Sequence, residues 1–132
     1  MDEPQAVDIK AIKAQLKARK KKMKMALRLC VHCSLCAESC FLFHAHNGDL
    51  RYMPSHKFIN SIGKLYRKRG RVSRQELEKI KEIVWRRCVL CNRCYCPLGI
   101  DIPEMIALGR SICRSQGVVY TWDEPWSVRP PD

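Results

Sequence analysis

Apolar residues recur along this chain at the three- and four-residue spacing of helices, and no segment alternates convincingly in the way that strands do. Residues 8–29 carry one such stripe, formed by Ile9, Ile12, Leu16, Met23 and Leu27. Residues 54–69 carry a second stripe, and residues 101–117 carry a third. We therefore expect an all-α fold built from amphipathic helices that are joined by loops.

Capping residues mark where several of these helices end. Residues 37–46 are expected to form a short apolar helix that carries Cys40 and stops at Asn47-Gly48. Pro54 opens the next helix, and Gly70 follows its end. The first half of the chain thus predicts a helix, a loop and a further helix.

The second half repeats this arrangement. Ser73 and Glu76 have the spacing of a capping box, which predicts a helix that runs to Arg87 and delivers Cys88. Asp101, followed by Pro103 and Glu104, is a second start signal, and it predicts a helix that ends before Gly117.

Eight of the nine cysteines lie in the two loops that separate these helices. The first group is Cys30, Cys33, Cys36 and Cys40, and the second is Cys88, Cys91, Cys94 and Cys96. The first group is spaced C-x2-C-x2-C-x3-C, the run that holds 4Fe-4S clusters in bacterial ferredoxins, and the second begins in the same way and ends in Cys-Pro. Two 4Fe-4S clusters are the leading interpretation.

The ligand sets are expected to cross between the two groups. In two-cluster ferredoxins the fourth cysteine of each run ligates the other cluster. We therefore assign Cys30, Cys33, Cys36 and Cys96 to cluster 1, and Cys88, Cys91, Cys94 and Cys40 to cluster 2. Only Tyr95 separates Cys94 from Cys96, and crossed ligation tolerates this short step because adjacent thiolates can point in opposite directions.

Two other kinds of cysteine chemistry remain as alternatives. Disulfides are disfavoured because the N-terminal residues do not resemble a signal peptide. Structural zinc is the stronger rival, although zinc sites usually use two cysteine pairs and not two triplets. Cys113, the ninth cysteine, lies in a helical stretch, where we expect it to be a small buried hydrophobic residue.

Other side chains near the cysteines are expected to tune the clusters. His32 lies between two ligands, and we interpret it as a neighbour, not a ligand. His44, His46 and His56 are expected at the surface. The apolar residues between the ligands are expected to limit water around the clusters; they are Val31, Leu35, Val89, Leu90 and Leu98. Three arginines that flank the second group either favour the reduced cluster or are ordinary surface charges; they are Arg86, Arg87 and Arg93.

Charge and composition divide the chain into three parts. We expect a basic N-terminal helix in residues 1–29, a cluster-binding domain in residues 30–117 and an extended tail in residues 118–132. In the tail, Trp122 and Trp126 are expected to dock on a partner subunit, with folding back onto the domain as the alternative. The net charge of +12 favours acidic partners.

The residues favour an electron relay over catalysis. Eight cysteines can complete the ligation of both clusters, so no iron is left open for a substrate. The chain has no glycine-rich phosphate loop and no convincing pair of nucleophile and base. It also lacks an apolar segment of about 20 residues that could cross a membrane. A different class, a basic nucleic-acid-binding module around a structural metal, would use residues 20–24 and 64–74.

Two stretches of sequence resemble a known family. Residues 30–40, with the first cysteine run, and residues 96–104, which read Cys-Pro-Leu-Gly-Ile-Asp-Ile-Pro-Glu, resemble the small iron-sulfur subunit of heterodisulfide reductases and related modules of membrane redox complexes. The likeness covers most of residues 26–117. It implies an α-helical ferredoxin fold and a non-catalytic electron-transfer subunit.

The resemblance also implies partners and a location. The partners would be a heterodisulfide-reductase-like catalytic subunit and a quinone-linked membrane subunit, with no direct nucleic acid. The location would be cytoplasmic, at the inner face of the membrane and held there through partners. A soluble electron-bifurcating assembly is the alternative.

Overall fold

In the computed structural model, residues 7–121 are described, and all their regular elements are helical. The α-helices are α1 (Ile9–Ala18), α2 (Lys20–Leu29), α3 (Phe41–Ala45), α4 (Pro54–Asn60), α5 (Ile62–Arg67), α6 (Arg74–Lys81) and α7 (Ile102–Ser115). Three shorter helical segments are η1 (Leu35–Ala37), η2 (Leu50–Tyr52) and the π-helix η3 (Glu82–Arg86). The expected all-α class is confirmed.

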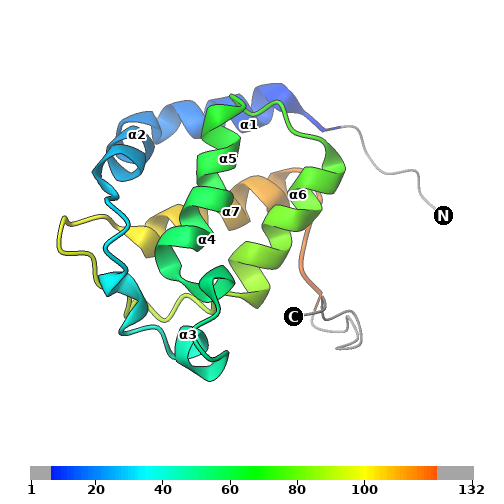
Figure 1. The fold of residues 1–132 in the computed structure, drawn as a ribbon. Coiled ribbons are helices and arrows are strands. Elements are labelled where there is room, and N and C mark those ends of the chain that lie inside the picture. The colour runs from blue at the N-terminus through cyan, green and yellow to red at the C-terminus, as the bar shows by residue number, and fades with distance from the viewer. Residues whose placement is uncertain (1–6, 122–132) are drawn as a thin grey trace.

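Helices α4 and α5 lie across the middle of the molecule, with α7 behind them and α1, α2 and α6 around them (Figure 1). The core between these helices consists of fully buried apolar side chains, among them Ile12, Met23, Phe58, Ile62, Leu65, Leu77, Ile80, Ile106 and Ile112. Burying each such side chain stabilises the fold by about 1.5–3 kcal/mol. Because Ile12 and Met23 belong to this core, the basic helices α1 and α2 pack on the same core as residues 30–117.

Two helices that were expected to be continuous are broken. The helix expected in residues 8–29 is interrupted at Arg19, where φ is −119°. The helix expected in residues 54–69 is interrupted at Ser61, whose buried hydroxyl donates to the Lys57 carbonyl at 2.7 Å. A serine that bonds back to the carbonyl four residues earlier often bends a helix.

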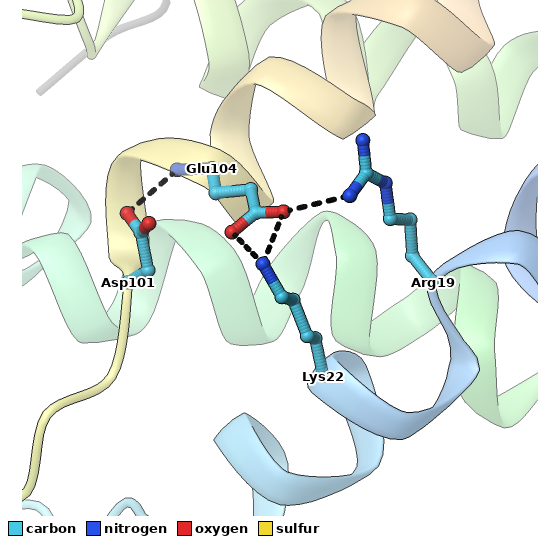
Figure 2. A network of polar contacts seen from close by, with 4 residues as sticks. All are labelled: Arg19, Lys22, Asp101 and Glu104. Carbon is cyan, nitrogen blue, oxygen red and sulfur yellow. Dashed lines mark hydrogen bonds and ion pairs between the residues drawn. The ribbon is translucent and has the colours of Figure 1, made fainter.

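The helix starts predicted at residues 8, 73 and 101 are confirmed, whereas the helix expected over residues 37–46 begins only at Phe41. Asp8 caps α1, and Ser73 with Glu76 forms the full capping box at the start of α6. Asp101 caps α7 by accepting from the Glu104 amide at 3.2 Å. The Glu104 carboxylate also binds Arg19 and Lys22, which joins the break between α1 and α2 to the first turn of α7 (Figure 2).

The helix expected to run from Ser73 to Arg87 changes form partway. It is an α-helix only to Lys81, and residues 82–86 continue as the π-helix η3. Gly109 of α7 faces η3 so closely that an added Cβ would lie 2.9 Å from Val84 Cγ1. The wider π turn therefore packs directly against the backbone of α7.

In residues 7–121, none of the helices combines the length and the apolar character that crossing a membrane requires.

Candidate iron-sulfur cluster site

Four cysteines from distant parts of the chain line one hollow, which we call the second hollow. They are Cys40, Cys88, Cys91 and Cys94. Cys40 comes from the loop before α3, whereas the other three come from the loop after η3. The structure therefore brings together the four residues that the crossed assignment gave to cluster 2.

The other four cysteines line a separate hollow, which we call the first hollow. They are Cys30, Cys33, Cys36 and Cys96. Cys94 and Cys96 thus lie in different hollows, although only Tyr95 separates them. The side chain of Tyr95 is exposed.

The two cysteine loops share a backbone pattern that the sequence does not show. In each loop the residues just before and just after the middle cysteine have positive φ. These residues are His32 and Ser34 around Cys33, at 57° and 67°, and Leu90 and Asn92 around Cys91, at 54° and 61°. Positive φ is uncommon for residues other than glycine and is found at ligand-binding sites, where each such residue costs of order 1–3 kcal/mol.

This pattern suits an anionic group. Backbones that alternate between right- and left-handed conformations form concave nests of amide groups, and such nests occur at many phosphate and iron-sulfur sites. An iron-sulfur cluster with four thiolates carries negative charge. The four cysteine donors that line each hollow and the two loop conformations are the kinds of group that hold a 4Fe-4S cluster.

The fourth cysteine of each group is held in a different way from the triplets. Cys40 was expected within a helix, but it precedes α3 as its N-cap residue, because the chain turns through η1 before α3 begins. Cys96 begins a turn in which its own carbonyl oxygen accepts a hydrogen bond from the Gly99 amide at 3.0 Å. Gly99 has a φ of 80°, which favours glycine at this position.

Arg110 of α7 holds the start of the second cysteine loop. Its guanidinium donates to the Val84 carbonyl at 2.8 Å and to the Cys88 carbonyl at 2.7 Å. The π-helix η3 and the first cysteine of the second triplet are thereby fixed to α7. π turns are frequent at functional sites.

The two hollows share part of their lining. Ile102, at the start of α7, lines both of them. Helix α4 also contributes to both, because Ser55 and Phe58 line the first hollow and Lys57 lines the second. A single pair of helices therefore sets the relative position of the two cysteine sets.

The pKa of one cysteine in the second hollow is strongly raised. Burial, followed by the nearby Cys88 thiol, raises the pKa of Cys94 to about 11.

Cys113, the ninth cysteine, lines neither hollow. It is fully buried in the core, and its Sγ lies 3.8 Å from the Leu77 carbonyl oxygen. The prediction that Cys113 is a buried hydrophobic residue is confirmed.

The apolar residues between the cysteines have varied surroundings. Val31 is 67% exposed and Val89 is 51% exposed, and Leu35 and Leu98 are also exposed. Val31 and Leu98 nevertheless line the first hollow, and Val89 lines the second. Leu90 differs, since it is partly buried against the core.

The flanking histidines and arginines have varied surroundings. His32 is exposed in the loop that lines the first hollow, and Arg93 is exposed. His44 is exposed as expected, whereas His46 and His56 are half-buried, and desolvation lowers the pKa of His56. Arg86 pairs with Glu82 at 3.5 Å, whereas burial lowers the pKa of Arg87.

Lys57, like Arg110, is a site residue that was not expected from the sequence. It is 2% exposed, and its Nζ lies 3.5 Å from Cys40 Sγ. A signal was present in the sequence, because Lys57 falls in phase with Pro54, Ser61 and Leu65 on the buried side of the helical stretch. An ionisable residue in a core position is rarely left there without a partner.

Trp122 and Trp126, expected to dock on a partner, lie outside the described residues.

Comparison with known proteins gives one result. The 4Fe-4S dicluster domain family matches residues 26–100, which include all eight cysteines of the two hollows. No curated protein matches the chain, and no solved structure does. The chain therefore belongs to the 4Fe-4S dicluster domain family, and it is an iron-sulfur, ferredoxin-like protein of a kind suited to electron transfer.

Proposed function

We propose that this protein is an electron-transfer subunit that relays single electrons through two 4Fe-4S clusters, within a heterodisulfide-reductase-like and membrane-associated respiratory complex. The observation that carries the relay is the pair of hollows, each lined by four cysteines drawn from both halves of the chain. The proposed ligands are Cys30, Cys33, Cys36 and Cys96 in the first hollow, and Cys40, Cys88, Cys91 and Cys94 in the second.

Each cluster, when bound, supplies a one-electron redox centre. The chain's own residues hold the two centres near one another, because Ile102 and helix α4 border both hollows. The middle cysteines, Cys33 and Cys91, are exposed, so each ligand set reaches the protein surface. A relay needs such an arrangement, with one centre open to a donor and the other open to an acceptor.

The surface around the hollows supports docking of larger redox partners. The exposed apolar residues Val31 and Leu98 border the first hollow, and Phe41 and Val89 border the second. Exposed apolar residues that gather near a site favour protein contacts. Partners on these two surfaces could be a catalytic subunit and a quinone-linked membrane subunit.

The identity of the complex rests on the resemblance of residues 96–104 to the small iron-sulfur subunit of heterodisulfide reductases. The same resemblance places the protein at the cytoplasmic face of a membrane through its partners. A soluble electron-bifurcating assembly is the alternative. Purification of the native complex in mild detergent separates the two, because only the first contains a membrane subunit and partitions with membranes.

The tail is proposed to anchor the subunit through Trp122 and Trp126. Truncation after Gly117 would be a poor test, because Val118 is buried and Tyr120 contacts Arg86. The double variant Trp122→Ala/Trp126→Ala keeps these contacts. Loss of co-purification with partners, together with full iron content, supports anchoring, and unchanged assembly rejects it.

Metal analysis tests the clusters directly. Protein purified without oxygen should be brown and contain about eight irons and eight acid-labile sulfides per chain. Reduction with dithionite should produce electron paramagnetic resonance signals from two reduced clusters. A colourless protein with stoichiometric zinc would reject the relay.

A basic nucleic-acid-binding module remains the competing class. Basic residues from α1, the start of α2 and the end of α5 do lie together, since one surface hollow is lined by Lys13, Lys17, Lys20, Arg67 and Arg69. Strongly salt-dependent binding to DNA or RNA, combined with a redox-silent metal, would favour that module.

A further inference from the structure

The amino group of Lys57 is buried beside the proposed ligands of the second hollow. The residue is 2% exposed, and its Nζ donates toward Cys40 Sγ at 3.5 Å. Cys94 lines the same hollow as Lys57. One lysine side chain, which brings a positive charge when it is protonated, therefore borders the cysteine set of this hollow.

Among the described residues, no carboxylate balances this charge. Within residues 7–121, no ion pair joins Lys57 to an aspartate or glutamate side chain, and the polar contact of its Nζ is the Cys40 sulfur. A buried charge is costly unless it is paired. The anionic group that can pair with Lys57 is the set of thiolates and the cluster that they hold.

The first hollow differs from the second in its cations. Its lining among the described residues contains no lysine or arginine, and helix α4 places Ser55 there, two residues before Lys57. The second hollow has a further cationic neighbour in Arg110, which donates to the Cys88 carbonyl. The two sites therefore share a ligand type and a loop conformation but differ in local charge.

This difference has a consequence for reduction. Adding one electron to a cluster with four thiolates makes the group more negative by one charge. A nearby cation stabilises the reduced form more than the oxidised form, and salt screens a buried pair much less than an exposed one. The charge of Lys57 therefore raises the reduction potential of the cluster beside it.

We propose that Lys57 sets the order of the two potentials, so that the cluster in the second hollow is reduced before the cluster in the first. In the protein reduced by one electron, the electron would then rest among Cys40, Cys88, Cys91 and Cys94. This inference depends on the proposed function, since it needs two 4Fe-4S clusters. Lys57 acts through its charge, as a positioning residue, and is not a ligand.

The experiment compares the two sites in the full-length protein. The variants Cys30→Ala/Cys33→Ala and Cys88→Ala/Cys91→Ala each leave one cluster, in the second and the first hollow respectively. Dithionite supplies the electrons in an anaerobic redox titration, and electron paramagnetic resonance reports the midpoint potential. The cluster left in the second hollow should have the higher potential.

Replacing the lysine tests its role. Lys57→Met should lower the reduction potential of the second-hollow cluster and leave that of the other cluster unchanged. Lys57→Arg keeps the charge, so its second-hollow potential should stay close to that of the original protein. Lys64→Met is the matched control, because Lys64 lies on the neighbouring helix, pairs with Glu76 at 3.9 Å and lines neither hollow. It should move neither potential.

Each outcome decides between support and rejection. An unchanged second-hollow potential in a fully loaded Lys57→Met protein would overturn the inference, as would an equal shift of both clusters. If Lys57→Met does not load its iron, the order of potentials in the two single-cluster proteins decides instead. Failure of the proposed function itself is distinguishable, because it would show as zinc or as a lack of any reduced cluster signal.

Discussion

Cys94 and Cys96, with only Tyr95 between them, line two different hollows. Cys94 lines the hollow of its own triplet, whereas Cys96 lines the hollow of the triplet formed by residues 30–36. Cys40 makes the reciprocal exchange, because it lines the second hollow. Cluster binding should consequently be linked to folding.

Crossed ligation predicts which cluster is lost when Cys40 is removed. Cys40→Ala should reduce the iron content from about eight to about four and leave the spectrum of the first-hollow cluster. Its electron paramagnetic resonance spectrum should match that of Cys88→Ala/Cys91→Ala. A spectrum that instead matches Cys30→Ala/Cys33→Ala would show that each run ligates its own cluster.

Cys113 should behave as a core residue with no part in ligation. Burial raises its pKa to about 12, and its side chain is inaccessible. Cys113→Ala should therefore keep about eight irons, and in the native protein iodoacetamide should fail to modify Cys113 at pH 8. Iron loss in Cys113→Ala, or rapid alkylation of the native thiol, would contradict this assignment.

The same raised pKa predicts a loss of stability in alkali. The native state keeps the Cys113 thiol protonated, whereas the unfolded chain releases this proton above its ordinary pKa. The unfolded state then binds fewer protons, so the contribution of Cys113 to stability declines as pH rises from about 9 to about 12. Denaturant unfolding of Cys113→Ala should show a weaker decline over this range than the original protein.

The start of α7 should depend on its cap more than on its ion pairs. Asp101→Ala removes the acceptor for the Glu104 amide and should lower the free energy of unfolding by about 1 kcal/mol. Glu104→Gln breaks the pairs with Arg19 and Lys22, which are partly exposed, and should cost less than about 1 kcal/mol. Thermal melts followed by circular dichroism should rank the two variants in this order, and only the Glu104 effect should shrink with added salt.

Gly109 should be intolerant of a larger side chain. The added Cβ in Gly109→Ala would lie 2.9 Å from Val84 Cγ1 and would push α7 away from the π-helix. Such overpacking typically costs about 1–3 kcal/mol, and it would disturb the Arg110 contact with Cys88. We expect a lower melting temperature and slower reconstitution of the second cluster, whereas Ala107→Ser, at an exposed position of the same helix, should change neither.

Local sequence signals predicted the helix starts and the chemistry of the site. Capping residues such as Ser73 and Asp101 act within one turn of helix, so their effect can be recognised without the rest of the protein. Cysteines two residues apart likewise share one loop whatever surrounds them. For this reason the all-α class, the cysteine groups and the family-level function all followed from short patterns.

Packing between distant segments decided the remainder. The break at Ser61, the π turn against Gly109 and the exposure of Val31 and Val89 depend on what each helix or loop packs against. The surroundings of Lys57 also depend on packing between distant segments, because its neighbour Cys40 comes from a different part of the chain. The sequence alone thus determined the helix starts and the cysteine donors, because both depend on residues close together in the chain. Only the tertiary structure decided which cysteines lie beside the buried lysine, because that depends on contacts between residues far apart in the chain.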